Sequence, residues 1–490
     1  MTQPCLFALR RVRSLLFVFA LIPLIPWPVA DVAAAERPNF ILCMTDDQGW
    51  GDVGYMQHPE LKTPVLDEMA ATGLRCDRFY AAHPVCSPTR GSFLTGRHPN
   101  RFACFSWGHT LRPEEVTLAE ALKQAGYATG HFGKWHLGSC RAEDPVSPGE
   151  SGFDTWVSSP NFYENDPLFS ENGVVKRAQG ESSQVTVRAA LKFIRQQQAK
   201  QQPFLAVIWF GNPHGPHIGT ADLKAPYADL SAAKQNYYAE IAGIDRAMGD
   251  LRKELDQIGA RENTVLLFTS DNGPQGKSAG SNGGLRGNKG TLYEGGVRVP
   301  GLIEWPRVIK SPRTSTATLS TSDIYPTMLE LAGAKVDQQP RLDGISFAPL
   351  LRGETPSARS LGFWVHPTGG ISTPADKLLA AQLEEQAGNA PSTAPPERTA
   401  ASRMEKKYPV DTFPGHATWL SPPWKLHRIS SGKKQTTETY ALYNLDEDPQ
   451  EQSDLSKQHP DRLNAMLKEL TTWQTSVVNS LNGADYIESK

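Results

Sequence analysis

Short apolar runs alternate along this chain with segments of helical periodicity. The apolar runs that are typical of buried strands cover residues 39–44, 127–132, 204–210 and 264–269. The segments with apolar residues at helical spacing cover residues 64–71, 118–124 and 236–258. Such alternation is typical of a mostly parallel sheet covered by helices on both faces. We therefore predict an α/β fold built on a doubly wound sheet.

Polar residues follow each of the apolar runs. In chain order they are Asp46, Asp47, Lys134, His136, His214, Asp271 and Asn272. Open α/β sheets bind ligands in the crevice outside the carboxyl ends of their strands. We expect these side chains to converge on one site, although they are far apart in sequence.

The pattern changes near residue 361, where a polar stretch begins that includes an Ala-, Pro-, Ser- and Thr-rich run at 389–403. Such composition is typical of an exposed insertion. The elements expected beyond this point are a helix at 376–386, strands at 424–429 and 440–445, and a helix at 461–481. The expected division is a main domain at 36–360, a variable insertion at 361–410 and a smaller C-terminal α+β subdomain at 411–490.

Residues 1–35 have the pattern of a secretory signal peptide. Arg10, Arg11 and Arg13 precede an apolar stretch at 15–24, and three alanines stand at 33–35. The apolar stretch is too short and too interrupted by proline for a membrane anchor. We expect an exported protein, secreted or periplasmic, with no membrane span.

The overall charge excludes some partners. The 490 residues carry a net charge of −2, which gives no sign of nucleic-acid binding. An anionic substrate must therefore be met by local positive charge.

Two acidic pairs offer hard oxygen ligands. Asp46 and Asp47 stand side by side, and Asp271 precedes Asn272. Either pair alone suits a helix cap or a turn equally well. Because both pairs end strands, and neighbouring carboxylates repel unless a cation lies between them, we favour a metal site. The lack of His and thiolate ligands in these pairs argues against zinc.

A longer motif carries a family resemblance. The run 86–90 reads Cys-Ser-Pro-Thr-Arg, and 94–97 reads Leu-Thr-Gly-Arg. Together they resemble the maturation signature of the type I, formylglycine-dependent sulfatases of the alkaline phosphatase superfamily. Residues 126–138, 288–296 and 424–449 are similar to further segments of that family, although Phe132 stands where the family usually has a small aliphatic residue.

The resemblance implies a cofactor and a modified nucleophile. Cys86 is expected to be oxidised to Cα-formylglycine (3-oxoalanine) by a formylglycine-generating enzyme. One Ca²⁺, with Mg²⁺ as the usual substitute, is expected to bind residue 86 and the two acidic pairs. The expected metal ligands are thus Asp46, Asp47, Cys86, Asp271 and Asn272.

The reaction implied by the resemblance is hydrolysis of a sulfate ester. The hydrated aldehyde at 86, held by Arg90, attacks sulfur while Lys134 and Lys289 neutralise the sulfate oxygens. His214 is expected to protonate the leaving oxygen, and His136 to take a proton from the second hydroxyl. We expect a helix to begin after Pro88 and to point its positive end at this site.

Rival functions stay open at this point. A phosphate or phosphonate monoester hydrolase of the same superfamily would suit such a pocket, as would a non-catalytic sulfated-glycan-binding protein. Residues of the loops that would suit a sugar at the pocket mouth, or simple packing, are Trp107, His109, Tyr163, His217, His366, His416 and Trp419. We expect a sulfated carbohydrate as substrate.

The remaining cysteines leave the redox state open. If Cys86 is modified, Cys43, Cys76, Cys104 and Cys140 remain after the signal, and they allow three pairings. Cys43, inside an apolar run, would equally be a buried thiol.

Overall fold

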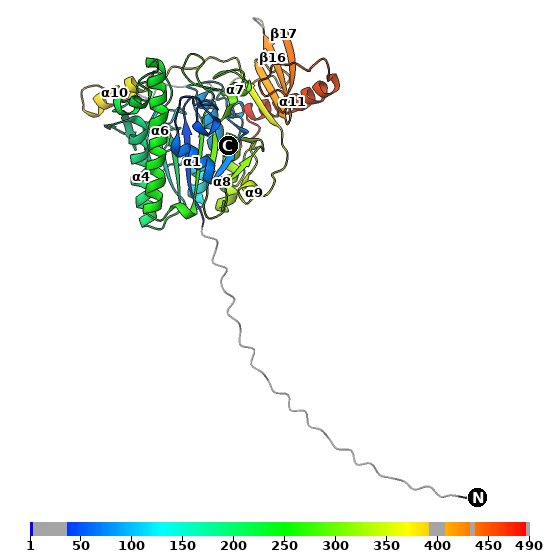
Figure 1. Ribbon diagram of the computed structural model, residues 1–490, viewed down its shortest axis with the longest axis horizontal. Coiled ribbons are helices and arrows are strands. Elements are labelled where there is room, and N and C mark those ends of the chain that lie inside the picture. Colours follow the sequence, from blue (N-terminus) through cyan, green and yellow to red (C-terminus); the bar gives the residue numbers. More distant parts are fainter. Residues whose placement is uncertain (3–36, 392–406, 432–436, 487–490) are drawn as a thin grey trace. The chain divides into compact units, whose positions relative to one another are not determined.

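The strand-like runs become neighbours in one sheet in this computed structural model. Across the described residues the sheet has ten strands in the order β12-β2-β11-β9-β1-β8-β4-β5-β6-β7 (Figure 1). The central strands β9, β1, β8, β4 and β5 run parallel, and β11 and β6 add antiparallel neighbours. In sheet order the strands span Arg313–Ser315, Leu74–Cys76, Gly301–Glu304, Thr264–Ser270, Asn39–Thr45, Phe204–Trp209, Ala128–Lys134, Thr155–Ser159, Leu168–Glu171 and Val174–Arg177.

The structure describes residues 1–2, 37–391, 407–431 and 437–486. Residues 3–35 of the predicted signal and residues 392–403 of the polar run lie outside these ranges. No helix within the described residues is both long enough and apolar enough to cross a membrane.

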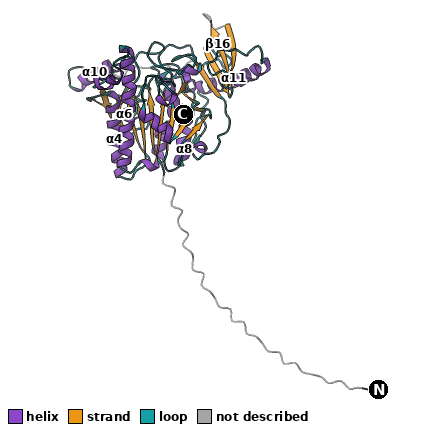
Figure 2. Cartoon of the chain, viewed as in Figure 1, coloured by secondary structure: helices purple, strands orange, loops and turns teal. Residues whose placement is uncertain are grey.

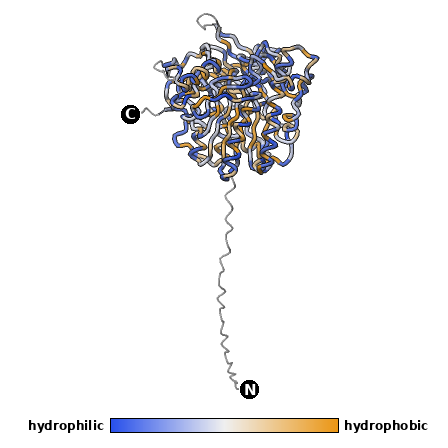
Figure 3. Tube along the Cα trace, turned by 90° about the vertical axis from the view of Figure 1, so that its left-hand side faces the viewer, coloured by the Kyte–Doolittle hydropathy of each residue, from blue (hydrophilic) through white to orange (hydrophobic). Residues whose placement is uncertain are grey.

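Helices cover both faces of the sheet because successive residues of its strands point to opposite sides. Phe40, Leu42 and Met44 of β1 join a core with α2, α3 and α8, whereas Ile41 and Cys43 join a second core with α1, α4 and α6. Helices and strands alternate through this body (Figure 2), and apolar stretches of chain alternate with polar ones (Figure 3). The α/β class and the doubly wound sheet are confirmed.

The predicted helices mostly keep the expected bounds. The α-helices of the described residues are α1 (Pro64–Thr72), α2 (Cys86–Thr95), α3 (Leu118–Gln124), α4 (Ser182–Ala199), α5 (Ala221–Lys224), α6 (Ala232–Gln257), α7 (Glu294–Val297), α8 (Ile324–Ala332), α9 (Ala348–Leu351), α10 (Ala375–Gln386) and α11 (Pro460–Leu481). Of these, α4, α5, α7, α8 and α9 were not predicted. α6 begins earlier than predicted because the Ser231 side chain caps it by accepting a hydrogen bond from the Lys234 N–H.

The start of α2 differs from the expectation that a helix follows Pro88. α2 begins at Cys86, so Pro88 is its third residue. Proline is tolerated there because N–H groups of the first helical turn have no partner within the helix. Cys86 therefore sits on the first turn itself.

A separate antiparallel sheet forms the C-terminal part. It has the order β14-β15-β16-β17, with bounds Leu361–Val365, His416–Ser421, Trp424–Ser431 and Thr437–Asn444. α11 packs against β15 and β16, and Leu426, Met466 and Leu470 share one core cluster there. This confirms the smaller C-terminal α+β unit. Strands β3 (Phe79–Tyr80), β10 (Arg298–Val299) and β13 (Leu319–Ser320) form a further short sheet.

A buried ion cluster joins the small sheet to the main body. The Lys425 ammonium on β16 lies 2.8 Å from Glu294 Oε1 and 3.1 Å from Glu451 Oε1, and these side chains have no solvent access. His427 Nε2 is 2.7 Å from the same Glu451 oxygen. Glu294 is the first residue of α7, so the cluster fixes the start of that helix.

The cysteines at positions 43, 76, 86, 104 and 140 are buried. Cys43, Cys76 and Cys104 are free thiols, and Cys140 is buried as well. None of the three pairings left open by the sequence is therefore present among the described residues.

We predict that Lys425→Met lowers the free energy of unfolding by about 3–5 kcal/mol, because it removes the ammonium shared by the buried Glu294 and Glu451 carboxylates. Among the described cations, it leaves Glu294 only Arg298, at 3.7 Å. Urea denaturation measures this loss. Lys468→Met, at an exposed position on α11, is the matched control and should change stability by less than about 0.5 kcal/mol. Equal stability of the two variants would contradict this role for Lys425.

Candidate active site

The predicted polar residues gather at the carboxyl ends of the central strands. Those that ion pairs and hydrogen bonds connect directly are Asp46, Asp47, Arg90, Lys134, His214, Asp271, Asn272 and Lys289. β9, β1, β8 and β4 are adjacent in the sheet, so segments more than two hundred residues apart in sequence end side by side. The convergence expected from the strand-end rule is present.

Opposite charges pair closely in this cluster. The nitrogen–oxygen distances are 2.6 Å for Lys134 and Asp46, 2.7 Å for Arg90 and Asp271, and 2.7 Å for Lys289 and Asp47. These side chains are at most 1% exposed, apart from Lys289 at 16%. Buried charges this close must balance, because an unpaired one is costly to desolvate.

Asp47 is held in an uncommon backbone conformation. Its φ is 66°, in the left-handed region that few non-glycine residues adopt. Its N–H donates to Asp271 Oδ1 at 3.0 Å, and Asn272 Nδ2 donates to Asp47 Oδ1 at 2.6 Å. The two acidic pairs, from β1 and β9, thus hold each other in place.

The surroundings shift the pKa values of these carboxyl groups in opposite directions. Burial raises the pKa of Asp271, and the charge of Asp46 adds to the rise. Burial also acts against ionisation of Asp46 and Asp47, but Lys134 brings the pKa of Asp46 below its usual value, and Lys289 does so for Asp47. The lysine partners of Asp46 and Asp47 therefore favour ionisation of these two carboxyl groups.

The donor set fits a hard divalent cation. Asp46 Oδ1 and Asn272 Oδ1 are buried and accept no hydrogen bond from any described residue. Ligand atoms of Asp46, Asp47 and Cys86 lie within 4.8 Å of one another. Buried oxygens without donors are the groups that a Ca²⁺ or Mg²⁺ ion satisfies. Asp46, Asp47, Asp271 and Asn272 therefore offer an all-oxygen cradle beside residue 86.

Cys86 lies at the start of α2, beside the charged cluster. It is 1% exposed, and burial raises the pKa of its thiol to about 12, although Lys134 and Lys289 act against the rise. Arg90, one turn further along α2, donates to the Lys134 carbonyl at 3.2 Å and stacks over the Trp209 ring at 5.1 Å. The first turn of α2 presents its positive end to this site.

His136 is positioned by residues that the sequence did not indicate. Its Nε2 lies 3.1 Å from Thr373 Oγ1, which also accepts a hydrogen bond from Asn161 Nδ2 at 2.8 Å. Its Nδ1 is buried without a partner in the described chain. Burial, reinforced by Lys134, holds the pKa of His136 well below its ordinary value. The lowered pKa favours the neutral imidazole, whose Nε2 contacts Thr373 and whose Nδ1 faces no partner in the described chain.

His214 lies close to Asp47. Its Nε2 lies 3.7 Å from Asp47 Oδ2, and its Nδ1 is 2.7 Å from the Gly215 carbonyl oxygen. The Phe162 ring stacks on the imidazole at 4.1 Å. Burial lowers the pKa of His214, although Asp47 acts against this. Phe162 is a further contact that no sequence pattern indicated.

The aromatic and imidazole residues considered for the pocket mouth divide into two groups. Trp107 is 41% exposed, and its carbonyl accepts from Ile371, two residues before Thr373. Its neighbour Gly108 donates to Ser87 Oγ, so this loop lies near the site. The other members of the set contact neighbours within the protein: His109 with Gly369, Tyr163 with Thr186, His217 with Glu240, His366 with Phe105, His416 with His427, and Trp419 with Glu469.

Comparison with known proteins identifies relatives of this chain. Residues 38–334 match the model of the protein family described as Sulfatase. N-acetylgalactosamine-6-sulfatase of Canis lupus familiaris is 34% identical over 358 residues, which cover 65% of this chain and 67% of that protein. Arylsulfatase G of the same species is 34% identical over 412 residues, covering 73% and 75%.

The fold also resembles a solved structure with a bound saccharide. The crystal structure of Ps i-CgsB in complex with k-i-k-neocarrahexaose matches with a TM-score of 0.74 and 23% identity. The match covers 89% of this chain and 93% of that chain. At this identity the likeness concerns the fold alone.

Thr373→Val should lower turnover of an aryl sulfate by about ten- to a hundredfold, because it removes the hydroxyl that orients His136 while nearly keeping the side-chain volume. Steady-state kinetics measure the loss, and thermal unfolding checks that the fold persists. Ser372→Ala, at the exposed neighbouring position, is the control. Unchanged kcat and kcat/KM in Thr373→Val would exclude this positioning role.

Proposed function

The chain belongs to the sulfatase family, within the alkaline phosphatase superfamily, and we propose that this sulfuric ester hydrolase removes sulfate from sulfated carbohydrate with one Ca²⁺ and a formylglycine at position 86. The observation that carries the proposal is the buried cluster around residue 86. There Asp46, Asp47 and Asp271 lie opposite Arg90, Lys134 and Lys289.

The charge of this cluster suits an anionic ester. The acids and bases balance one another, so a bound divalent cation leaves the pocket with a net positive charge of about two. Local charge of this kind can draw an anion to a protein whose net charge is −2. A sulfate monoester brings one negative charge, and released sulfate brings two.

A saccharide substrate is supported by the relatives. One is named for removing sulfate from N-acetylgalactosamine, and a protein of similar fold was crystallised with a neocarrahexaose. The exposed Trp107 ring near the site offers an apolar face to a sugar.

Asp46, Asp47, Asp271 and Asn272, with an oxygen of the modified residue 86, would hold the Ca²⁺ ion. When bound, the ion polarises the oxygens that it contacts and stabilises negative charge on the sulfate group. Asn272 Oδ1 and Asp46 Oδ1 accept no hydrogen bond in the described chain, so they would bind the ion without giving up a hydrogen bond.

Formylglycine would supply what the buried thiol lacks. Its hydrated aldehyde provides a hydroxyl nucleophile together with a second hydroxyl whose proton can be removed to release the product. The matching run from 86 to 97 is the recognition segment for a formylglycine-generating enzyme, the expected partner in maturation.

The chain's own residues then divide the remaining work. Arg90 fixes the start of α2 against the Lys134 carbonyl, so residue 86 keeps its direction. Lys134 and Lys289 place ammonium groups beside it, where they neutralise negative charge on the sulfate oxygens.

The two histidines hold and move protons. His136, neutral and unpartnered at Nδ1, serves as the base on the side of Thr373. His214, whose Nε2 lies near Asp47, donates a proton to the departing alcohol oxygen. Asp47 favours the charged imidazole that this step requires.

We also propose export of this enzyme to a secreted or periplasmic location. The proposal rests on the sequence of residues 1–35, with its basic start, apolar stretch and terminal alanines.

Both maturation and activity should depend on Cys86. In protein made with the modifying enzyme, the peptide containing residue 86 should have the mass of formylglycine and resist thiol alkylation. Cys86→Ala should lower hydrolysis of an aryl sulfate by more than roughly a thousandfold while staying folded. Cys76→Ala, a buried thiol on β2, is the matched control.

Full activity with Cys86 as an intact thiol would refute the modified nucleophile. A higher kcat/KM on the paired aryl phosphate than on the aryl sulfate would favour the phosphoesterase rival. A modified protein inactive on defined sulfated glycans would favour the non-catalytic rival.

Removal of one ligand should weaken the metal site measurably. In chelator-treated protein, added Ca²⁺ should raise the melting temperature, because a ligand that binds the folded state stabilises it. Asp271→Asn should need at least about tenfold more Ca²⁺ for the same rise, since it removes a charge from the cradle. Asp229→Asn, on an exposed loop, is the control, and no response to Ca²⁺ in the wild type would refute the assignment.

A further inference from the structure

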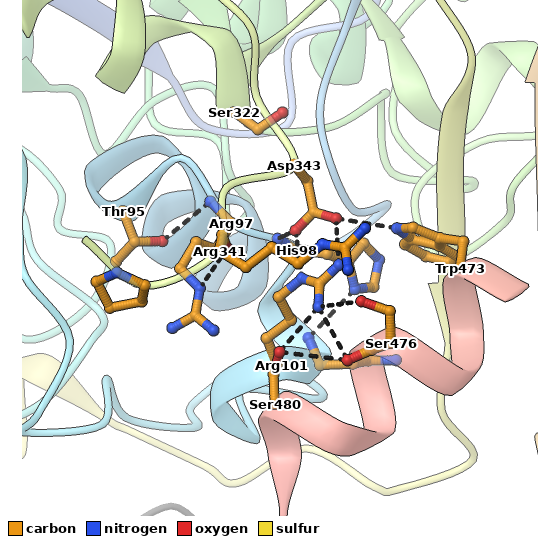
Figure 4. A network of polar contacts seen from close by, with 12 residues as sticks. Thr95, Arg97, His98, Arg101, Ser322, Arg341, Asp343, Trp473, Ser476 and Ser480 are labelled. Carbon is orange, nitrogen blue, oxygen red and sulfur yellow. Dashed lines mark hydrogen bonds and ion pairs between the residues drawn. The ribbon is translucent and has the colours of Figure 1, made fainter. Parts of the chain in front are cut away.

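A second cavity lies where the main body meets the C-terminal sheet. Its volume is about 180 Å³, and its walls come from α2, from the 3₁₀ helix Pro99–Phe102 and the residue before it, from the loop at 341–343, and from β14, β15 and α11. None of the candidate catalytic residues lines it. Figure 4 shows the network of polar contacts around Arg101, Asp343 and Trp473, which line this cavity.

The cavity carries an excess of positive charge. Arg101, Arg341 and Arg359 line it together with Asp343. Asp343 binds Arg101 through two hydrogen bonds of 2.6 and 2.8 Å, and Arg359 pairs with Asp323. Arg341 is exposed and forms no ion pair with any described residue, so one guanidinium remains uncompensated.

Hydrogen-bond donors in the wall also lack acceptors. His98 is 2% exposed, and its Nδ1 accepts from the Asn100 N–H at 3.3 Å. The proton of the neutral ring therefore lies on Nε2, since burial lowers the pKa of His98 to about 3. Neither His98 Nε2 nor the fully buried Ser92 Oγ has a hydrogen-bond partner within the described chain. Two residues that line this positively charged cavity thus carry buried donors without an acceptor, a combination that favours an anionic oxygen.

Two tryptophans stand beside these donors. The Trp419 and Trp473 ring centroids are 6.0 Å apart with an interplanar angle of 48°, and both rings line the cavity. Hydrogen bonds fix them, from Trp419 Nε1 to Glu469 at 2.7 Å and from Trp473 Nε1 to Asp343 at 2.9 Å. Fixed indole faces are suited to the apolar face of a sugar ring.

We propose that this cavity is a second binding site for a sulfated saccharide. The sulfate group enters between Arg341, His98 and Ser92, and the sugar ring rests on Trp419 and Trp473. Ser92 lies six residues beyond residue 86 on α2, so the same helix borders both sites. The inference of a bound oxyanion stands on the cavity alone, and the saccharide part rests on the proposed function.

Binding measurements without turnover test the proposal. Calorimetric titration of the Cys86→Ala protein with a hexose 6-sulfate, the unsulfated hexose and inorganic sulfate separates the contributions of sulfate and sugar. The sulfated hexose should bind at two sites. Lys289→Ala should weaken one of them and Arg341→Ala the other, each by at least about tenfold.

Matched variants separate the two parts of the site. Ser92→Ala should weaken the second site without lowering the melting temperature, because the hydroxyl has no partner to lose. Trp419→Ala should weaken binding of the sulfated hexose but not of inorganic sulfate. Arg352→Ala, an exposed arginine paired with Glu330, should change neither.

The outcomes distinguish this site from the catalytic one. Unaltered titrations in both Arg341→Ala and Ser92→Ala would overturn the proposal. Inorganic sulfate binding there as tightly as the sulfated hexose would overturn its saccharide part. A protein that retains the Arg341-dependent site but hydrolyses no sulfate ester would refute the proposed function and leave this site standing.

Discussion

Asp46, Asp47 and Asp271 pair with Lys134, Lys289 and Arg90 in a region almost without solvent access. The two members of each pair come from different elements of the fold. Because an uncompensated buried charge is costly, this balance is reached only when β1, β9, β4 and α2 are all in register. Because of this constraint, the charged site forms only together with the fold. The same balance leaves the cluster close to neutral, so a bound divalent cation would make its net charge positive.

α2 shows how this constraint shapes local sequence. All ten of its residues are buried, including Arg90, so it has no polar outer face and gains little from amphipathicity. Its position depends on the elements packed around it. On one side it presents residue 86 to the charged cluster, and further along Ser92 faces the second cavity.

The sequence was sufficient for features with a regular period or a local rule. Continuous apolar runs located the central strands, and the strand-end rule brought Asp46 and Asp271 together. Contacts that follow no periodic pattern in the sequence could not be predicted. Thr373 contacts His136 across 237 positions, and Phe162 stacks on His214. The start of α2 at Cys86 was missed because Pro88 suggested a helix that begins after it, whereas the first turn of a helix accepts proline. Short outer strands such as β12 and β2 carry too few residues for a pattern.

The burial of Cys86 has a consequence for the order of events during synthesis. The modification proposed for residue 86 needs an accessible chain, whereas Asp271 and Lys289, which complete the charged cluster, emerge roughly two hundred positions later. At ribosomal rates of about 5–20 residues per second, the interval between residues 86 and 289 lasts roughly 10–40 s. The proposed modifying enzyme would therefore act within that interval, before the cluster that encloses residue 86 can form.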